Sequence, residues 1–186
     1  MKLKKEKIWN VPNVLTMIRM LLIPVYWVLF MQGHRFIALA VFIVASLTDL
    51  ADGYIARKYN LITDFGKLMD PLADKLMVLS VMLSLAIKSF VPWAPLIILL
   101  CKEGLMVLGG VVLLKKGVVV YAEKIGKIAQ TFVVSSLLLS FFQPEFVALG
   151  FPVHLILLWI AVALTLSALV FYGKSAVKKF KAASES

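Results

Sequence analysis

Six apolar segments, separated by short polar connections, constrain the fold of this chain more than any other feature. Each approaches the roughly 20 residues that an α-helix needs to cross the hydrocarbon core of a bilayer. A soluble domain of 186 residues could not bury a chain that is 62% hydrophobic. We therefore expect an all-α integral membrane protein with six transmembrane helices, near residues 13–31, 35–56, 66–88, 93–114, 125–143 and 152–173.

No separate soluble domain accompanies these segments, so residues 1–186 are predicted to form a single transmembrane domain. Residues 1–12, which carry several lysines beside Ile8 and Trp9, are predicted to form an interfacial helix. Residues 174–186 are predicted to form a basic tail.

Basic residues are distributed unevenly among the connections. The N-terminus, the second and fourth connections and the tail hold most of the lysines, whereas the alternate connections hold only Arg35 and Lys88. The positive-inside rule therefore places both termini and the second connection in the cytoplasm, in a multi-pass protein of the plasma membrane. The formal net charge of +10 then fits membrane lipids with anionic headgroups, and nucleic acid is not an expected partner.

Four aspartates interrupt the apolar pattern around the second connection. Asp49 and Asp52 lie near the end of the second segment, and Asp70 and Asp74 lie near the start of the third. Spacings of three and four residues place each pair on one face of its helix. An ionised side chain at membrane depth costs about 2.5–3.5 kcal/mol on insertion scales, so four acids need a compensating cation. Oxygen ligands favour Mg²⁺ or Mn²⁺.

Small residues and one arginine accompany the four acids. Gly53 and Ala56 follow Asp52 on the second segment, and Gly66 precedes Asp70 on the third. Small side chains leave room for a ligand to lie against the backbone. Arg57, at the end of the second segment, has the planar fork that suits a phosphate. Together these residues predict a phosphoryl-transfer site between helices, at the cytoplasmic side of the membrane.

The acids could also serve a purely structural role or an ion pathway. Arg19, Lys75 and Lys102 could neutralise them in a charge network without chemistry, but three bases are too few for four aspartates and Glu103, and the glycines would be unexplained. An ion-coupled transporter could also use intramembrane acids. These acids lie within roughly two helical turns of the cytoplasmic face, however, rather than at the midplane that alternating access prefers.

The spacing of eight positions resembles the signature of the CDP-alcohol phosphotransferase family. Those positions are Asp49, Asp52, Gly53, Ala56, Arg57, Gly66, Asp70 and Asp74. Residues 11–19, which read VPNVLTMIR, are similar to the start of the phosphatidylglycerophosphate synthase and cardiolipin synthase branches of that family. Length and the layout of six segments agree as well, so the resemblance covers essentially the whole chain.

The resemblance implies that two divalent cations, Mg²⁺ or Mn²⁺, bind the aspartates at 49, 52, 70 and 74, and that Asp74 is also the general base. An acceptor hydroxyl would lose its proton to Asp74 and attack the lipid-side phosphorus of CDP-diacylglycerol, and CMP would leave. The cytidine diphosphate would lie against Gly53, Ala56, Arg57 and Gly66, with Asn13, Thr16 and Thr63 nearby. The family also implies a homodimer.

The acceptor alcohol is where this chain departs from the family pattern. Phosphatidylglycerophosphate synthases usually carry Arg-Glu in the fourth helix, a further arginine about two turns later, and Gly-Lys-x-Lys at the fifth. Here those places read Lys102-Glu103, Gly110 and Gly126-Lys127-Ile128-Ala129. The leading acceptor is sn-glycerol 3-phosphate, because Lys127 with Lys102 or Arg19 can bind a phosphate. The alternatives are phosphatidylglycerol, as in cardiolipin synthesis, or another alcohol.

Overall fold

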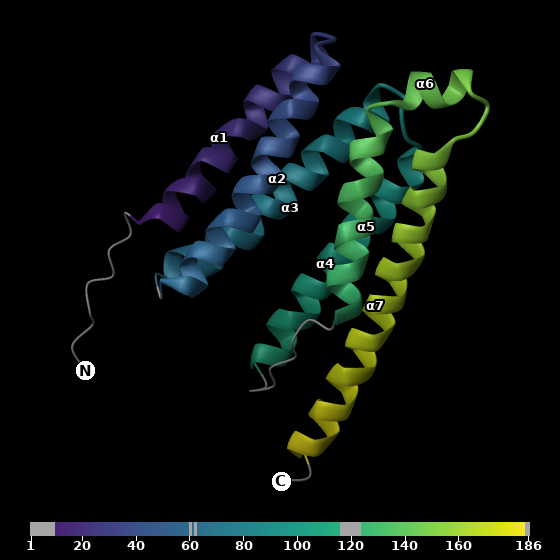
Figure 1. Cartoon of the computed structure of the whole chain (residues 1–186). Helices are drawn as coiled ribbons and strands as arrows, with labels where there is room; N and C mark the ends of the chain where they lie inside the picture. Colours follow the sequence, from purple (N-terminus) through teal and green to yellow (C-terminus); the bar gives the residue numbers. More distant parts are fainter. Residues whose placement is uncertain (1–9, 60, 62, 116–123, 185–186) are drawn as a thin grey trace. The chain divides into compact units, whose positions relative to one another are not determined.

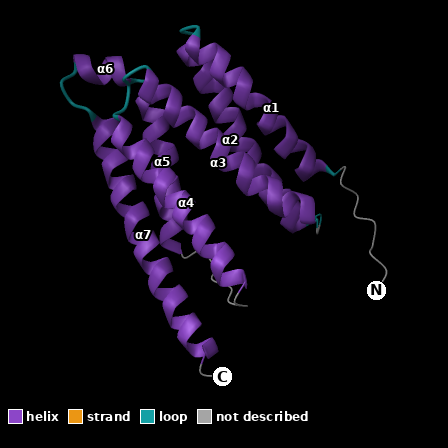
Figure 2. Cartoon of the chain, turned by 180° about the vertical axis from the view of Figure 1, so that it is seen from behind, coloured by secondary structure: helices purple, strands orange, loops and turns teal. Residues whose placement is uncertain are grey.

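The computed structural model describes residues 10–59, 61, 63–115 and 124–184 (Figure 1). Every regular element among these residues is a helix, and they contain no strand (Figure 2). The predicted all-α class is therefore confirmed. The helices are α1 (Val11–Met31), α2 (Arg35–Lys58), α3 (Asp64–Ile87), α4 (Trp93–Lys115), α5 (Lys124–Ser140), α6 (Gln143–Ala148) and α7 (Val153–Ser184).

Four stretches of the described chain are long and apolar enough to cross a membrane. They are α1, α2, Trp93–Gly110 of α4 and Val153–Val177 of α7. The apolar part of α5, Ile125–Ser140, is shorter, and α3 carries several charged residues, among them Asp70 and Asp74. The chain is thus a multi-pass helical membrane protein. Its long helices coincide in position with the six predicted segments, whereas membrane crossing by α3 and α5 stays a prediction.

The chain divides into two compact units, Met1–Ile87 and Lys88–Ser186. A single domain over residues 1–186 stays a prediction. Most of the predicted interfacial segment, residues 1–9, lies outside the described residues, whereas Val11 and Pro12 form the first turn of α1.

In the first unit, α1 packs against both α2 and α3. The C-terminal half of α1 buries Tyr26 and Phe30, whose rings stack with their centroids 5.8 Å apart. The Tyr26 hydroxyl is hydrogen-bonded to the Ser84 hydroxyl of α3 at 2.7 Å. Gly33, with a φ of +89°, makes the tight turn into α2. The apolar packing therefore lies at the end of α1 that is distant from the four aspartates of α2 and α3.

In the second unit, α7 packs against α5 and α4 and contacts the short α6. His154 is buried at the start of α7 and stacks on Phe146 of α6, with ring centroids 5.4 Å apart. The sequence predicts a last helix that ends near residue 173, but α7 continues to Ser184. The predicted tail consists mainly of lysine and alanine, which are good helix formers, so the helix has no local reason to stop at the membrane boundary.

Candidate active site

Three buried polar residues recur along α1 at intervals of three. They are Asn13, Thr16 and Arg19, each no more than 2% exposed. Residues at this spacing lie on nearly the same face of a helix. Since α1 packs against α2 and α3, this face is where α1 meets the helices that carry the four aspartates. We call these three residues the α1 polar stripe.

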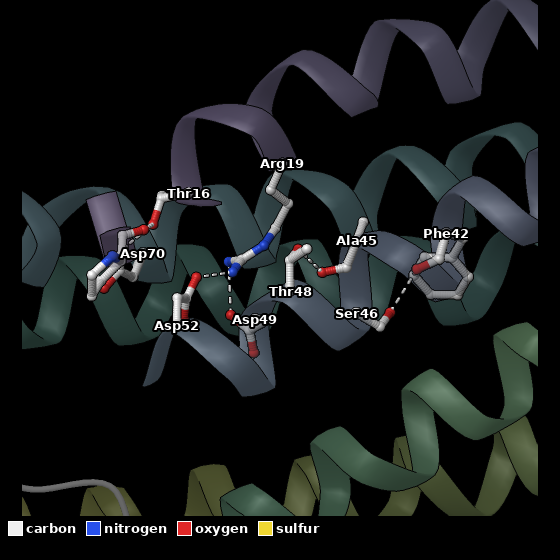
Figure 3. Close-up of polar contacts among 10 residues, drawn as sticks. Thr16, Arg19, Phe42, Ala45, Ser46, Thr48, Asp49, Asp52 and Asp70 are labelled. Atoms are coloured by element: carbon white, nitrogen blue, oxygen red, sulfur yellow. Dashed lines mark hydrogen bonds and ion pairs between the residues drawn. The ribbon is translucent and has the colours of Figure 1, made fainter. Parts of the chain in front are cut away.

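Arg19 joins the two aspartates of α2 (Figure 3). Its Nη1 lies 2.7 Å from Asp49 Oδ1, and its Nη2 donates to Asp52 Oδ2 in a second ion pair. Arg19 and Asp52 are buried, whereas the Asp49 side chain is 37% exposed. The Arg19 Nε is also buried and has no hydrogen-bond partner among the described residues. The guanidinium is thus shared between two carboxylates while part of its donor capacity is unused.

Thr16 holds the first aspartate of α3. Its hydroxyl donates to Asp70 Oδ1 at 2.5 Å and also approaches the Pro12 carbonyl oxygen at 3.1 Å (Figure 3). Asp70 is thus held by Thr16, and the two aspartates of α2 are held by Arg19, three residues further along the α1 polar stripe. Acids from α2 and α3 therefore lie near one another, on the side of each helix that the α1 polar stripe contacts.

Other hydroxyls near this site are used inside α2. The Ser46 hydroxyl donates to the Phe42 carbonyl at 2.9 Å, and the Thr48 hydroxyl donates to the Ala45 carbonyl at 2.7 Å (Figure 3). Such bonds to the preceding turn satisfy a hydroxyl within its own helix. In Figure 3, the hydrogen bonds and ion pairs between helices thus come from α1.

Hydrogen bonds also join the first turns of α1 and α3. Asn10 caps α1 by accepting the Asn13 N–H at 2.9 Å, and its own amide donates to the Leu61 carbonyl at 3.0 Å. Thr63 precedes α3, and its hydroxyl accepts the Gly66 N–H at 3.0 Å, as an N-cap does. The Asn13 amide donates to that same hydroxyl at 3.0 Å. The two helix starts are therefore fixed together, one turn before Asp70.

Gly66 is needed because of this network. A Cβ at this position would lie 2.8 Å from Asn13 Oδ1, 3.2 Å from Thr63 Oγ1 and 3.5 Å from Asp70 Oδ2. No larger residue fits without moving these oxygens. At Gly53, by contrast, a Cβ would meet only the Arg57 Nη2, at 3.6 Å, which is an ordinary contact. Of the two glycines predicted to make room for a ligand, only Gly53 leaves free space, because the chain's own polar groups fill the space at Gly66.

The other predicted site residues are placed as follows. Ala56 is half-buried and Arg57 is exposed in the last turn of α2, and Asp74 is half-buried one turn after Asp70 on α3. Lys127 is exposed in the first turn of α5, in the second unit. Lys102 pairs with Glu103 of the same unit, with its Nζ 2.6 Å from Oε1. Of the three bases considered as neutralising partners, Arg19 is therefore paired with motif acids and Lys102 with its sequence neighbour.

A comparison with protein families identifies the motif that these aspartates form. The sequence model described as CDP-alcohol phosphatidyltransferase matches residues 9–167, which include all eight motif positions. The chain belongs to the CDP-alcohol phosphatidyltransferase family. The family resemblance predicted from the motif is thus confirmed.

Individual relatives of this CDP-alcohol phosphatidyltransferase cover between half and nearly all of the chain. The CDP-diacylglycerol–glycerol-3-phosphate 3-phosphatidyltransferase of Bacillus subtilis is 38% identical over 175 residues, covering 84% of this chain and 90% of that protein. The protein of the same name from Rickettsia bellii is 39% identical over 177 residues, covering 92% and 97%. A probable phosphatidylglycerophosphate synthase of Mycobacterium tuberculosis is 33% identical over 105 residues, covering 53% and 50%.

The donor set of this phosphatidyltransferase suits divalent cations. The four motif aspartates supply only oxygen ligands, which Mg²⁺ and Mn²⁺ prefer. The Arg19 guanidinium between Asp49 and Asp52 marks a position where positive charge is favourable. In the arrangement described, however, no three acidic, histidine or cysteine side chains among the described residues converge closely enough to hold a metal ion. The four aspartates are therefore chemically suited to bind Mg²⁺ or Mn²⁺, and the metal site itself stays a prediction.

The sequence analysis misses one part of the site and gives another only as an alternative. Asn10 was missed, although an asparagine two residues before Pro12 is a common start of a helix. Pairing of Arg19 with the acids is predicted only within the alternative charge network, beside Lys75 and Lys102, although its register with Asn13 and Thr16 places all three on one face. That register is the signal that could have favoured Arg19 over the two lysines as the partner of Asp49 and Asp52.

Proposed function

We propose that this protein transfers the phosphatidyl group of CDP-diacylglycerol to sn-glycerol 3-phosphate, giving phosphatidylglycerophosphate and CMP. The observation that carries the proposal is the convergence of Asp49, Asp52 and Asp70 of the family motif on one polar stripe of α1. The acceptor follows from relatives at 38% and 39% identity whose names specify glycerol 3-phosphate.

The aspartates at 49, 52, 70 and 74 are the proposed ligands of two divalent cations, Mg²⁺ or Mn²⁺. When bound, such a pair supplies stabilisation of the charge on the attacking and leaving oxygens. The chain's own groups prepare this site before any ligand arrives, because Thr16 fixes one Asp70 oxygen and Arg19 fixes the carboxylates of α2. Such preorganisation is what displacement at phosphorus requires.

Asp74 is the proposed general base. It lies one turn after Asp70 on α3, so both carboxylates occupy the same side of the helix. The acceptor hydroxyl gives its proton to Asp74, its oxygen forms a bond to the lipid-side phosphorus, and the bond from that phosphorus to the CMP oxygen breaks. The electron pair of the broken bond leaves with CMP, so the step needs no other reactant.

The nucleotide end of the donor is proposed to lie at the end of α2. Gly53 leaves room there, and Arg57 is exposed and can donate two hydrogen bonds to a phosphate. Ala56 adds a small side chain on the same turn. Asn13, Thr16, Thr63 and Gly66 are hydrogen-bonded to one another or to Asp70, so their first role is to position the helix starts on which a nucleotide would rest.

The membrane arrangement is proposed from the charge distribution. The lysines of the connections support a plasma-membrane protein with six crossings, in which both termini and the acid-bearing ends of α2 and α3 face the cytoplasm. Its acyl substrates and surrounding lipids would then lie in the bilayer. A homodimer is proposed from the family resemblance.

The acceptor phosphate is proposed to bind Lys127, which is exposed at the start of α5. A phosphomonoester carries close to two negative charges at neutral pH, so a lysine is a suitable partner. At Gly110, where the family pattern expects an arginine, a Cβ would lie 3.8 Å from the Tyr172 hydroxyl of α7. The Tyr172 hydroxyl therefore lies beside the position where the family pattern expects an arginine.

The decisive experiment measures CMP release by the purified protein. The protein is incubated with CDP-diacylglycerol and Mg²⁺ or Mn²⁺, together with glycerol 3-phosphate, phosphatidylglycerol or an uncharged alcohol. We expect release that depends on glycerol 3-phosphate, stops with EDTA and returns with excess Mg²⁺. Preference for phosphatidylglycerol would establish cardiolipin-type chemistry instead. Ion-coupled flux across proteoliposomes without CMP release would establish a transporter.

A further inference from the structure

Arg19 is the most completely buried charge in the described first unit, at 1% exposure. A buried cation is stable only when it is paired, and the same holds for the carboxylates beside it. The guanidinium of Arg19, on α1, pairs with both aspartates of α2, which lie three residues apart. This ion-pair cluster therefore contributes to the contact between α1 and α2 when no metal is bound.

The two ion pairs differ in how firmly they are held. Asp52 is buried and accepts a hydrogen bond from Nη2. Asp49 is 37% exposed, and Nη1, although only 2.7 Å away, has no hydrogen-bond partner of acceptable geometry among the described residues. Because Nε is also unused, the guanidinium is not saturated. The Asp49 side of the cluster is thus the more accessible and the less constrained one.

A divalent cation and this guanidinium would compete for the same oxygens. Carboxylate ligands approach Mg²⁺ to about 2.0–2.1 Å, so a metal on Asp49 and Asp52 would lie within a few ångströms of Arg19. Two cations at that separation repel each other strongly in a site of low dielectric constant. The absence of a converging group of three metal-binding side chains, within the part of the chain that the structure describes, agrees with carboxylates that are oriented towards Arg19.

We propose that Arg19 is the counter-ion of the metal-free site, and that a divalent cation displaces it from Asp49 and Asp52 on binding. Arg19 is then a positioning residue with two effects. It keeps the two aspartates of α2 in place before loading, and it lowers the affinity of the site for the metal. The inference rests on the proposed metal role of the four aspartates.

Side-chain NMR tests the displacement in the unaltered protein. The chain contains only three arginines, Arg19, Arg35 and Arg57, so ¹⁵N-arginine labelling in detergent micelles gives a simple spectrum. Arg19→Lys and Arg35→Gln assign the signals. We expect titration with Mg²⁺ to shift the Arg19 signal and to leave that of Arg35 unchanged, since Arg35 lies over the Phe36 ring at the other end of α2. Calorimetry on the same sample reports whether Mg²⁺ binds at all.

The two possible failures are distinguishable in that experiment. If calorimetry shows no binding of Mg²⁺ or Mn²⁺, the proposed metal role fails. If Mg²⁺ binds while the Arg19 signal stays at its metal-free position, the metal role stands and the counter-ion inference is overturned.

The affinity for Mn²⁺ supplies the second test, measured from free Mn²⁺ by electron paramagnetic resonance. We expect Arg19→Gln to bind Mn²⁺ at least about tenfold more tightly, because the metal no longer breaks charge-assisted bonds. Arg19→Lys, which keeps the charge without the fork, should lie between Arg19→Gln and wild type, and Arg35→Gln should match wild type. Unchanged or weaker binding in Arg19→Gln would contradict the inference, because a residue that only supports the fold does not oppose the metal.

Thermal unfolding connects the two effects of Arg19. In EDTA, Arg19→Gln should unfold at a lower temperature than wild type, and saturating Mn²⁺ should raise its Tm by more than it raises that of wild type. If Arg19→Gln does not fold, Arg19→Lys and the NMR titration decide the question. An equal Mn²⁺-induced rise in Tm for wild type and Arg19→Lys, together with equal Mn²⁺ affinity, would count against displacement.

Discussion

The two halves of α1 face the same neighbours, α2 and α3, but they are held by different forces. The C-terminal half buries the stacked rings of Tyr26 and Phe30 among apolar side chains. The N-terminal half buries the α1 polar stripe, whose contacts are ion pairs and hydrogen bonds. Apolar packing is insensitive to ligands, whereas contacts made by charges change when another charge binds. The comparison therefore assigns stability to one half of α1 and response to ligands to the other.

Replacement of the general base should have the largest effect and should leave both halves of α1 intact. Asp74→Asn removes the proton acceptor, so we expect turnover to fall by roughly 100- to 10,000-fold while CDP-diacylglycerol binding is retained. CMP release and donor binding are measured on the same preparation. Asp64→Asn, which changes an exposed acid in the first turn of the same helix, is the matched control. Wild-type turnover in Asp74→Asn would remove this residue as the base.

A cavity in the apolar half should affect stability and not the response to metal. Phe30 is 3% exposed, so Phe30→Ala should destabilise the protein by about 3 kcal/mol. Thermal unfolding in detergent should show the same loss with EDTA and with Mg²⁺. Leu21→Ala, at a position of α1 that is 69% exposed, is the control and should change the Tm little. A loss in Phe30→Ala that Mg²⁺ restores would mean that the two halves are not independent.

Removal of one hydroxyl from the α1 polar stripe should have the opposite pattern. Thr16→Val keeps the shape of the side chain but removes the hydrogen bond to Asp70, a charge-assisted bond worth about 1.5–3 kcal/mol. We expect kcat/KM to fall at least about tenfold, with a higher metal requirement. Thr48→Val removes a hydroxyl bonded only within α2 and should behave like wild type. An equal effect of the two substitutions would break the comparison.

The smallest effect is expected outside the first unit. Lys127→Ala should raise the KM for glycerol 3-phosphate about tenfold, or ~1.5 kcal/mol, and should leave the KM for CDP-diacylglycerol unchanged. Lys174→Ala, at an exposed lysine of α7, is the control. An unchanged acceptor KM in Lys127→Ala would remove Lys127 from the acceptor site.

The positions of the helices, and the pairs of aspartates that share a helix face, could be predicted from the sequence because both depend on local spacing. Segment lengths fixed the positions of the long helices, and intervals of three and four residues fixed which acids share a face. Which side of each helix is buried could not be predicted in the same way. In a membrane protein the outer surface is apolar too, as at Leu21 and Leu50, each 69% exposed, so apolar periodicity does not mark the buried side.

Polar residues mark the buried side of α1 instead. Asn13, Thr16 and Arg19 could have revealed this face, because a polar side chain within a membrane helix turns towards protein partners. Apart from the pairing of Arg19 with the acids, which was one alternative, their partners could not be predicted. Asn13 and Thr63 are 50 residues apart in the sequence, and their hydrogen bond depends on how two helices meet. The close approach of Asn13 to Gly66 could not be predicted for the same reason, since Asn13 lies on another helix.

The ion pairs of Arg19 have a consequence for the insertion of the nascent chain. Arg19 is synthesised 33 residues before Asp52, so α1 leaves the ribosome with a charge whose partner does not yet exist. A lone arginine within a membrane helix costs about 2.5–3.5 kcal/mol on insertion scales. Once α2 has emerged, the two charges can enter the bilayer as a pair. The position of Arg19 therefore favours the transfer of α1 and α2 from the translocon as a helical hairpin rather than one helix at a time.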